Sequence, residues 1–318
     1  MEHRDRTVRT IWTITLMLVV VSLLAGCGSA GTTPLKYRFE AGDSFAYDLA
    51  VTLDGSVEGP GIPAGESQAM RDLGLQMGVS WTVDHVEDGI ATITYRYTEL
   101  RMTQNGRPID ADVPTMPPIT VTMDATGKVL SVEGLEGTMP PGLNLGNGLP
   151  FDPAQFMAQT NVVFPQDGLA EPGDEWTAES SVEIPGAGQS VTATSKARLM
   201  SVEKVDGTEV ANIDFNVDVP MDLTLDLGAL LKEMGLDQMM PAGSDPQDLA
   251  FKMSLQGQEI LDGSTQVDTG NGMPESLEAD LTVTLVIAVT DAPAAIPQDQ
   301  RGPFSIDVTA HLSMTRIR

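Results

Sequence analysis

The segment ANIDFNVDVPMDLTLDL, residues 211–227, decides the fold class, because apolar and polar side chains alternate along it. A period of two places alternate side chains on opposite faces of a β-strand. One face would carry Ile213, Phe215, Val217, Val219, Met221, Leu223, Leu225 and Leu227. The other would carry Asp214, Asn216, Asp218, Asp222 and Asp226. Pro220 falls on the polar side, so the pattern predicts either one long edge strand or two strands broken at Pro220.

The same alternation recurs along most of the chain. It covers residues 45–53, 73–83, 91–97, 281–289 and 304–314. The pair Asp88-Gly89, between the second and third of these segments, is a β-hairpin turn signal. The sequence therefore predicts a mainly β protein with antiparallel, curved sheets, either half-barrel or barrel-like.

Turn motifs in the first half of the chain return in the same order in the second half. The matched pairs are Gly42-Asp43 with Gly173-Asp174, Val83–Gly89 with Val202–Gly207, and Met123–Gly127 with Val267–Gly270. Such self-similarity predicts an internal duplication. We expect a first β repeat over residues 35–165 and a second over residues 166–318, which form either one domain or two.

Each half also contains a segment with helical signals. Asp152-Pro153 is typical of a helix N-terminus, and Leu227–Met240 has helix-forming composition. We expect short helical inserts there. Met234, Met239, Met240 and Met253 lie in or near the second insert, and flexible thioethers suit the mouth of an apolar ligand site. Ordinary packing of a helix on a sheet is the alternative explanation.

The N-terminus has the features of an export signal. Arg4, Arg6 and Arg9 precede the uncharged, mostly apolar segment Ile11–Leu24. Fourteen helical residues reach about 21 Å, which is short of a hydrocarbon core of about 30 Å. An export signal is thus favoured over a permanent membrane span.

Leu24-Ala25-Gly26-Cys27, directly after this segment, resembles the bacterial lipobox. The resemblance implies that Cys27 receives a diacylglycerol and that a signal peptidase recognises Leu24, Ala25 and Gly26. Residues 1–26 would then be the signal peptide, and residues 27–34 a flexible tether. The alternative is an uncleaved anchor helix with an incidental cysteine.

A wider resemblance rests on the lipobox, the repeated strands and the linking segment FPQDGLAEPGDEW, Phe164–Trp176. Together they resemble a family of uncharacterised bacterial surface lipoproteins. The strand pattern is also similar to the half-barrel lipoproteins of the LolA and LppX type. That second resemblance implies a concave sheet that holds acyl chains under helical lids.

Charge and composition exclude several classes of function. The chain has 18 basic and 45 acidic side chains, and a net charge of −27 disfavours nucleic acid and anionic lipid surfaces as partners. Aromatic residues make up 5%, too few for a platform that stacks sugars or bases. With a single cysteine, the exported part forms no internal disulfide, so its stability depends on an apolar core.

The sequence contains no recognisable catalytic or metal-binding motif. His85 and His311 lack the spacing of a zinc site or of a catalytic base with its orienting acid. The acidic row consists of Asp214, Asp218, Asp222 and Asp226, whose neighbours are four residues apart, or about 13 Å in a strand, which is too far to share one ion. The segment Asp268–Gly272 could bind Ca²⁺ weakly, but it is a good hairpin turn without any ion. We therefore expect neither an enzyme nor a cofactor.

These features predict a lipid-anchored protein on the extracytoplasmic face of a cell membrane or envelope. The expected function is non-enzymatic binding of an apolar or lipid ligand. The alternative is a structural or protein-interaction module of the envelope that uses its acidic surface.

Overall fold

The computed structural model describes residues 32–60, 70–109, 117–134, 163–184, 189–226, 252–291 and 302–318. Within these ranges the secondary structure is β-strand and turn. The strands of the first half are β1 (Thr33–Pro34), β2 (Ser44–Glu58), β3 (Met70–Glu87), β4 (Ile90–Gln104), β5 (Arg107–Pro108), β6 (Ile119–Asp124) and β7 (Val129–Glu133). Those of the second half are β8 (Leu169–Ala170), β9 (Glu175–Ile184), β10 (Gln189–Val205), β11 (Thr208–Asp226), β12 (Lys252–Asp268), β13 (Pro274–Asp291) and β14 (Phe304–Ile317).

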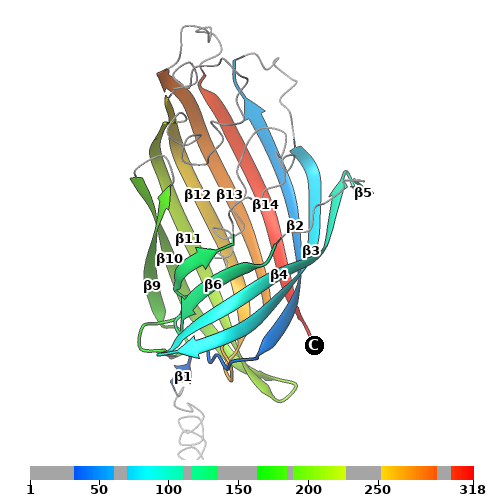
Figure 1. Cartoon of the computed structure of the whole chain (residues 1–318), viewed down its shortest axis with the longest axis vertical. Coiled ribbons are helices and arrows are strands. Elements are labelled where there is room, and N and C mark those ends of the chain that lie inside the picture. Colours follow the sequence, from blue (N-terminus) through cyan, green and yellow to red (C-terminus); the bar gives the residue numbers. More distant parts are fainter. Residues whose placement is uncertain are drawn as a thin grey trace, which may run out of the picture.

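Both halves of the chain contribute to one large antiparallel sheet (Figure 1). Its strand order is β7-β6-β4-β3-β2-β14-β13-β12-β11-β10-β9, with β5 paired to β4, and β1 and β8 form a separate two-stranded sheet. The mainly β, antiparallel fold predicted from sequence is confirmed, but in the described residues a single continuous sheet replaces the two expected ones. The predicted helical inserts at Asp152-Pro153 and Leu227–Met240 lie outside the described residues.

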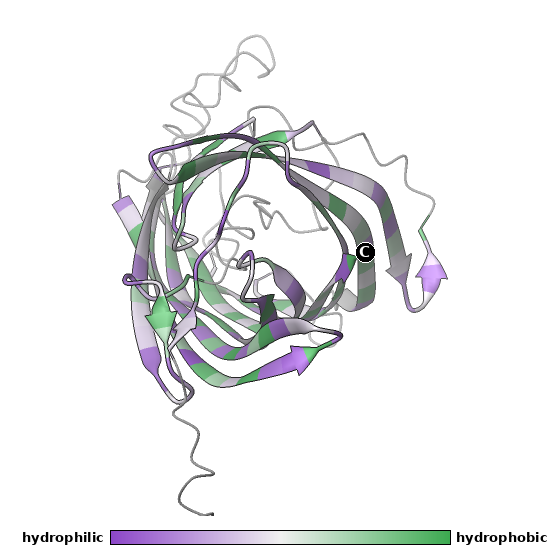
Figure 2. Ribbon diagram, turned by 90° about the horizontal axis from the view of Figure 1, so that it is seen from below, coloured by the Kyte–Doolittle hydropathy of each residue, from purple (hydrophilic) through white to green (hydrophobic). Residues whose placement is uncertain are grey.

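The sheet is strongly curved, and hydrophobic and hydrophilic residues alternate along its strands (Figure 2). Because buried side chains from strands on both sides of the sheet join one cluster, the apolar face is the concave one and the polar face is the outer one. Strand β14 is a clear example. Ile306, Val308, Ala310 and Leu312 are buried, whereas Asp307, Thr309 and His311 between them are exposed. Burial of one face supplies the main driving force for folding of such a sheet.

Pro220 explains how far β10 pairs along β11. Strand β11 is one continuous strand, paired with β12 along its whole length from Val210 to Asp226. Its pairing with β10 ends at Asp218, two residues before Pro220. Proline lacks a backbone N–H, so it is tolerated where a strand has a neighbour on one side only. Of the two predicted alternatives, one long strand is observed over residues 208–226. It is not an edge strand, because β10 pairs with it as far as Asp218, and Pro220 lies in the part that pairs with β12 alone.

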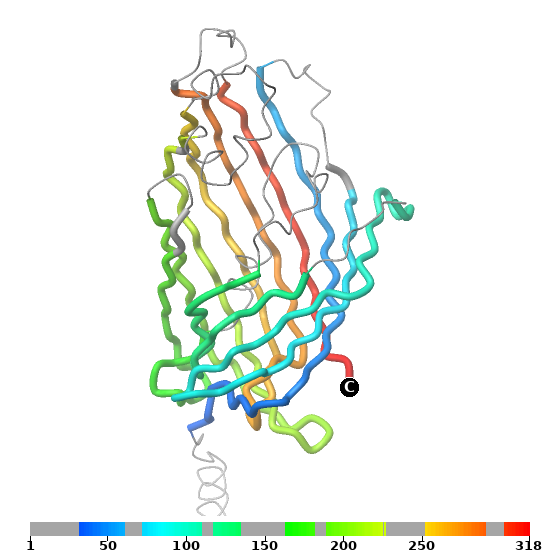
Figure 3. Tube along the Cα trace, in the orientation of Figure 1, coloured from blue at the N-terminus to red at the C-terminus, as the bar shows by residue number. Residues whose placement is uncertain are grey.

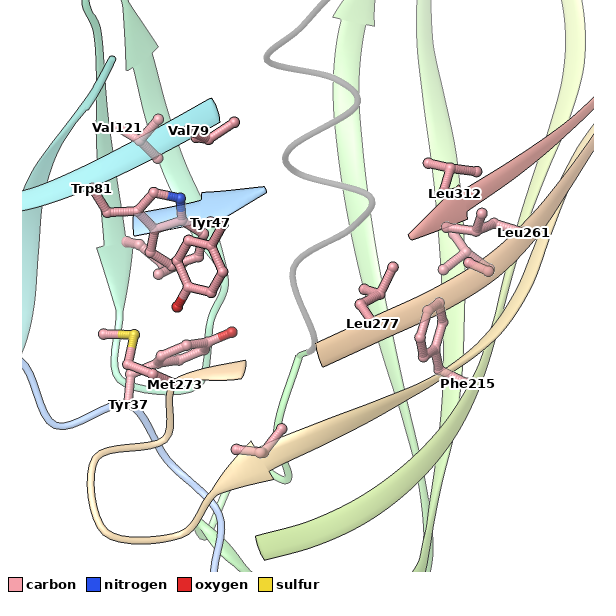
Figure 4. Close-up of a cluster of buried hydrophobic side chains, with 14 of the residues drawn as sticks. Tyr37, Tyr47, Val79, Trp81, Val121, Phe215, Leu261, Met273, Leu277 and Leu312 are labelled. Carbon is pink, nitrogen blue, oxygen red and sulfur yellow. The ribbon is translucent and has the colours of Figure 1, made fainter. Parts of the chain in front are cut away.

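The centre of the core is an aromatic cluster on β2, β3 and β4. The ring of Trp81 lies 5.2 Å from that of Tyr47 and 4.9 Å from that of Tyr95, between ring centroids. Both tyrosines are almost completely buried, and burial raises the pKa of the Tyr47 hydroxyl. Leu261, Leu277 and Leu312 come from β12, β13 and β14, so the core spans both halves of the chain (Figure 4).

One end of the sheet is crossed by a floor, which we define as residues 33–38 and 164–170. The N–H of Leu35 donates to the carbonyl of Gly168 at 2.9 Å, and β1 pairs with β8. The N–H of Tyr37 donates to Ala125, in the β6–β7 turn, and that of Arg38 donates to Asn271, in the β12–β13 turn. The floor thus joins turns from both halves, at the same end as the β3–β4 hairpin (Figure 3).

The Gly-Asp turns matched in the sequence make equivalent hydrogen bonds. The N–H of Gly42 donates to Val83 at 2.8 Å, and the N–H of Gly173 donates to Leu199 at 2.7 Å. The side chain of Asp43 accepts from the N–H of Glu40, as that of Asp174 does from Glu171. The structural partner of Val83 is therefore Leu199, three residues before the Val202 that the sequence comparison matched. The division into two repeats stays a prediction.

Candidate functional site

A second apolar cluster lies on the concave face, toward the end of the sheet opposite the floor. Val57, Leu285, Ile306 and Val308 are its buried members. Leu53, Met221, Leu255, Val283 and Ile287 pack against it and are partly buried. Val57 on β2 is opposite Ile306 on β14, which is opposite Leu285 on β13. We call this set the concave cluster.

One carboxylate lies on this apolar face. Glu259 on β12 is opposite Val219 on β11 and Val283 on β13. Its side chain is half-buried. A carboxylate on an otherwise apolar surface can fix the orientation of a bound ligand. Glu259 was missed in the sequence because residues 252–268 were not recognised as a strand.

Among the predicted site residues, Met253 lies within the described strands. It is half-buried on β12 and opposite Val289 of β13. Met234, Met239 and Met240 lie outside the described residues. So do Leu24, Ala25, Gly26 and Cys27.

The two described histidines lie on the exposed side of the sheet. His85 is 3.6 Å from Glu87. His311 on β14 lies between two carboxylates of β13, with Nδ1 at 2.9 Å from Asp280 and Nε2 at 3.2 Å from Glu278. The hydrogen bond with Asp280 is the main cause of a raised pKa for His311. No local pattern in the sequence predicts this cluster, because its members meet only through the pairing of β13 with β14.

The acidic row on β11 takes part in hydrogen bonds with β12. Gln258 donates to Asp218 at 2.8 Å, and Gln256 donates to Asp222 at 3.4 Å. Asn216, two residues before Asp218 on β11, donates to Asp262 at 2.7 Å. Across the described ranges, His, Cys, Asp and Glu do not form a group of three or more that could hold a metal ion. In the same ranges there is no helix of the length and apolarity that a membrane span needs.

Near the floor, two arginines converge on a single carboxylate. Glu275 at the start of β13 accepts from Arg316 at 2.7 Å and from Arg318 at 2.9 Å. The guanidinium of Arg316 also lies over the ring of Phe45, 4.8 Å from its centroid. The Glu275 side chain is 13% exposed and that of Arg316 is 20% exposed, so solvent screens this pair only in part.

We expect Glu275→Ala to lower the free energy of unfolding by about 2 kcal/mol, because the charge of Arg316 would stay partly buried without its partner. Urea denaturation of the folded domain measures the change. Glu175→Ala is the control, since Glu175 and Arg198 form a 3.7 Å pair in which both side chains are more than half exposed. It should change stability by less than about 0.5 kcal/mol. Equal losses in the two variants would contradict this account.

Comparisons with known proteins assign no family. No protein-family model matches the chain, and no curated protein matches it. Among solved structures, that of Salmonella typhi OmpF in complex with daunomycin aligns over 88% of this chain and 100% of its own, with 8% sequence identity and a TM-score of 0.24. At that TM-score the likeness carries no argument about this protein.

Proposed function

We propose that the chain is a lipid-anchored extracytoplasmic protein that binds the apolar part of a ligand on its concave face, without catalysing a reaction. The observation that carries the binding proposal is the concave cluster. It continues the apolar face of β2 and β11–β14 well beyond the aromatic core at the floor end. Apolar surface lined by several strands, with one polar group among them, is typical of sites for apolar ligands.

The proposed anchor rests on the sequence alone. An uncharged segment of export-signal length ends at Leu24-Ala25-Gly26-Cys27. Two or more acyl chains would hold the protein at a membrane, since each buried CH₂ contributes about 0.8 kcal/mol.

A non-enzymatic role is supported by the placement of the described titratable groups. His85 and His311 are exposed with the outer-face residues, away from the concave cluster. On the concave face, Glu259 is opposite Val219 of β11 and Val283 of β13. A histidine on the outer face is not within hydrogen-bond reach of a group bound on the concave face, as general acid–base chemistry would require.

Two substitutions on adjacent residues of β13 test the binding proposal. Ile287 faces the concave cluster and Val286 faces outward, 40% exposed. We expect Ile287→Asp to weaken binding of a fluorescent fatty acid at least about tenfold, because it puts a charge where apolar contact is needed. Val286→Asp should leave binding unchanged, since it adds the same charge on the other face.

Fluorescence titration of the exported domain gives both affinities, and circular dichroism with thermal unfolding checks that each variant is folded. Should Ile287→Asp fail to fold, Ile287→Ala is the substitute, with a smaller loss of affinity. Equal binding by the two aspartate variants would contradict a concave site. Absence of binding even in the unmodified protein would favour the alternative function, an acidic interaction module of the envelope.

A further inference from the structure

We infer that the anchored protein is oriented with its floor next to the membrane. The concave cluster is then reached from the side facing away from the anchoring membrane. This inference rests on the proposed lipid anchor at Cys27. It adds a direction to that proposal: the ligand enters from the aqueous side, and not from the leaflet that holds the anchor.

The length of the tether places the floor close to the membrane. Thr33, the first residue of β1, is six positions after Cys27. An extended chain spans at most about 3.6 Å per residue, so β1 lies within about 22 Å of the acylated residue. The floor is therefore the first part of the folded domain that the anchor reaches.

Packing at the floor leaves no route for a ligand through that end of the described sheet. Leu35, Tyr37 and Phe164 are 1%, 3% and 2% exposed. The rings of Tyr37 and Phe164 lie 4.9 Å apart between centroids. Met273, in the β12–β13 connection, is completely buried in the same core. Close-packed protein interiors do not pass a ligand without local unfolding.

The concave cluster lies far from this end. Strand β11 has 19 residues, which corresponds to about 60 Å along the strand. Its start at Thr208 is near the floor, because Glu209 accepts a hydrogen bond from Thr269 in the β12–β13 turn. The concave cluster lies toward the opposite strand ends. Val57 is next to Glu58, where β2 ends, and Ile306 is close to Phe304, where β14 begins. Leu285 lies in the part of β13 that ends at Asp291.

The charge of the domain disfavours the orientation in which the sheet lies flat on the membrane. Without its first 26 residues, the chain has 15 basic and 43 acidic side chains. Exposed acids such as Asp214, Asp222 and Asp262 are spread along the outer face of β11 and β12. Contact between this face and anionic headgroups would bring like charges together.

Energy transfer between the protein and lipid headgroups tests the orientation. The chain contains one cysteine, which acylation converts to a thioether, so a newly introduced thiol can be labelled selectively. Glu87 and Glu58 form a matched pair: both are exposed, Glu87 ends β3 at the floor end, and Glu58 ends β2 at the opposite end. The full acylated protein, as Glu87→Cys or Glu58→Cys with a donor fluorophore, is placed in phosphatidylcholine vesicles containing headgroup-labelled acceptor lipid.

We expect strong energy transfer to the lipid from the label at Glu87→Cys. The label at Glu58→Cys should show only a small part of that transfer. Equal transfer from the two sites, or stronger transfer from Glu58→Cys, would overturn the inference. Vesicle flotation and the mass of the N-terminal peptide report the anchor separately. A protein that floats with acylated Cys27 but transfers equally from both labels refutes the orientation alone. A chain that is not acylated and does not float refutes the proposed anchor, and the orientation with it.

Discussion

Replacing Cys27 by alanine will abolish acylation of the exported chain and leave its precursor uncleaved before residue 27. The thiol is the attachment point that the lipobox resemblance implies, and cleavage in that class of protein follows lipid attachment. Cys27 is the single cysteine of the sequence, so no other thiol can take its place. Because acyl chains supply the membrane affinity, the variant should also be lost from the detergent phase in Triton X-114 partitioning.

Ser29→Ala is the matched control, since it changes a small residue two positions after the lipobox. This variant should be acylated, cleaved and partitioned like the unmodified protein. Intact-mass measurement of the two variants expressed in a bacterial host separates precursor from mature form. A normally cleaved Cys27→Ala chain that still enters the detergent phase would show that the lipobox interpretation is wrong.

Gly272→Ala will destabilise the domain by about 3 kcal/mol or more, through two effects that add. Gly272 has a φ of +77°, a conformation that costs an L-residue about 1–2 kcal/mol. A Cβ there would also lie 2.2 Å from the Lys36 carbonyl oxygen and 2.8 Å from the Tyr37 Cα. Both contacts are backbone atoms of the floor, so relief requires the floor to move, and overpacking of this kind costs about 1–3 kcal/mol.

Gly89→Ala separates the two effects. Gly89 has a φ of +80° in the β3–β4 hairpin turn, and a Cβ there would meet no heavy atom within 4 Å. Gly89→Ala should lower the free energy of unfolding only by the cost of the left-handed conformation, about 1–2 kcal/mol. Urea denaturation of both variants gives the difference, which measures how tightly the floor packs on the β12–β13 turn. If the two losses are equal, the floor is not held in place by that turn.

Much of the sheet could be predicted from the sequence, because alternation over a long segment is a local signal. The strands around Phe45, Trp81, Ile93, Phe215 and Val308 all lie where the pattern placed them. Strand β12 was missed because Gly257, Glu259 and Gly263 occupy its concave face and interrupt the apolar row. The Gly263 position has a physical explanation: a Cβ there would lie 2.8 Å from the Phe215 ring, so the phenylalanine fills the space over the glycine.

The candidate site itself could not be predicted, since it depends on which strands are neighbours. The concave cluster combines Val57 with Leu285 and Ile306, from strands more than two hundred positions apart in the sequence. Nothing local marks β2 and β14 as partners. The floor was likewise unexpected, because residues 33–38 were interpreted as the end of a tether and the start of a repeat. Of the four methionines proposed as a ligand mouth, Met253 lies within the described residues, on the face that carries the concave cluster.

The pairing of β2 with β14 also determines when the chain can complete its fold. Strand β2 ends at Glu58 and β14 begins at Phe304, so about 250 residues separate two strands that lie side by side in the middle of the sheet. At synthesis rates of about 5–20 residues per second, β2 waits roughly 12–50 seconds for its partner. The N-terminal half meanwhile has a free edge. Removal of β14 would therefore leave β2 and β13 without the strand that joins them.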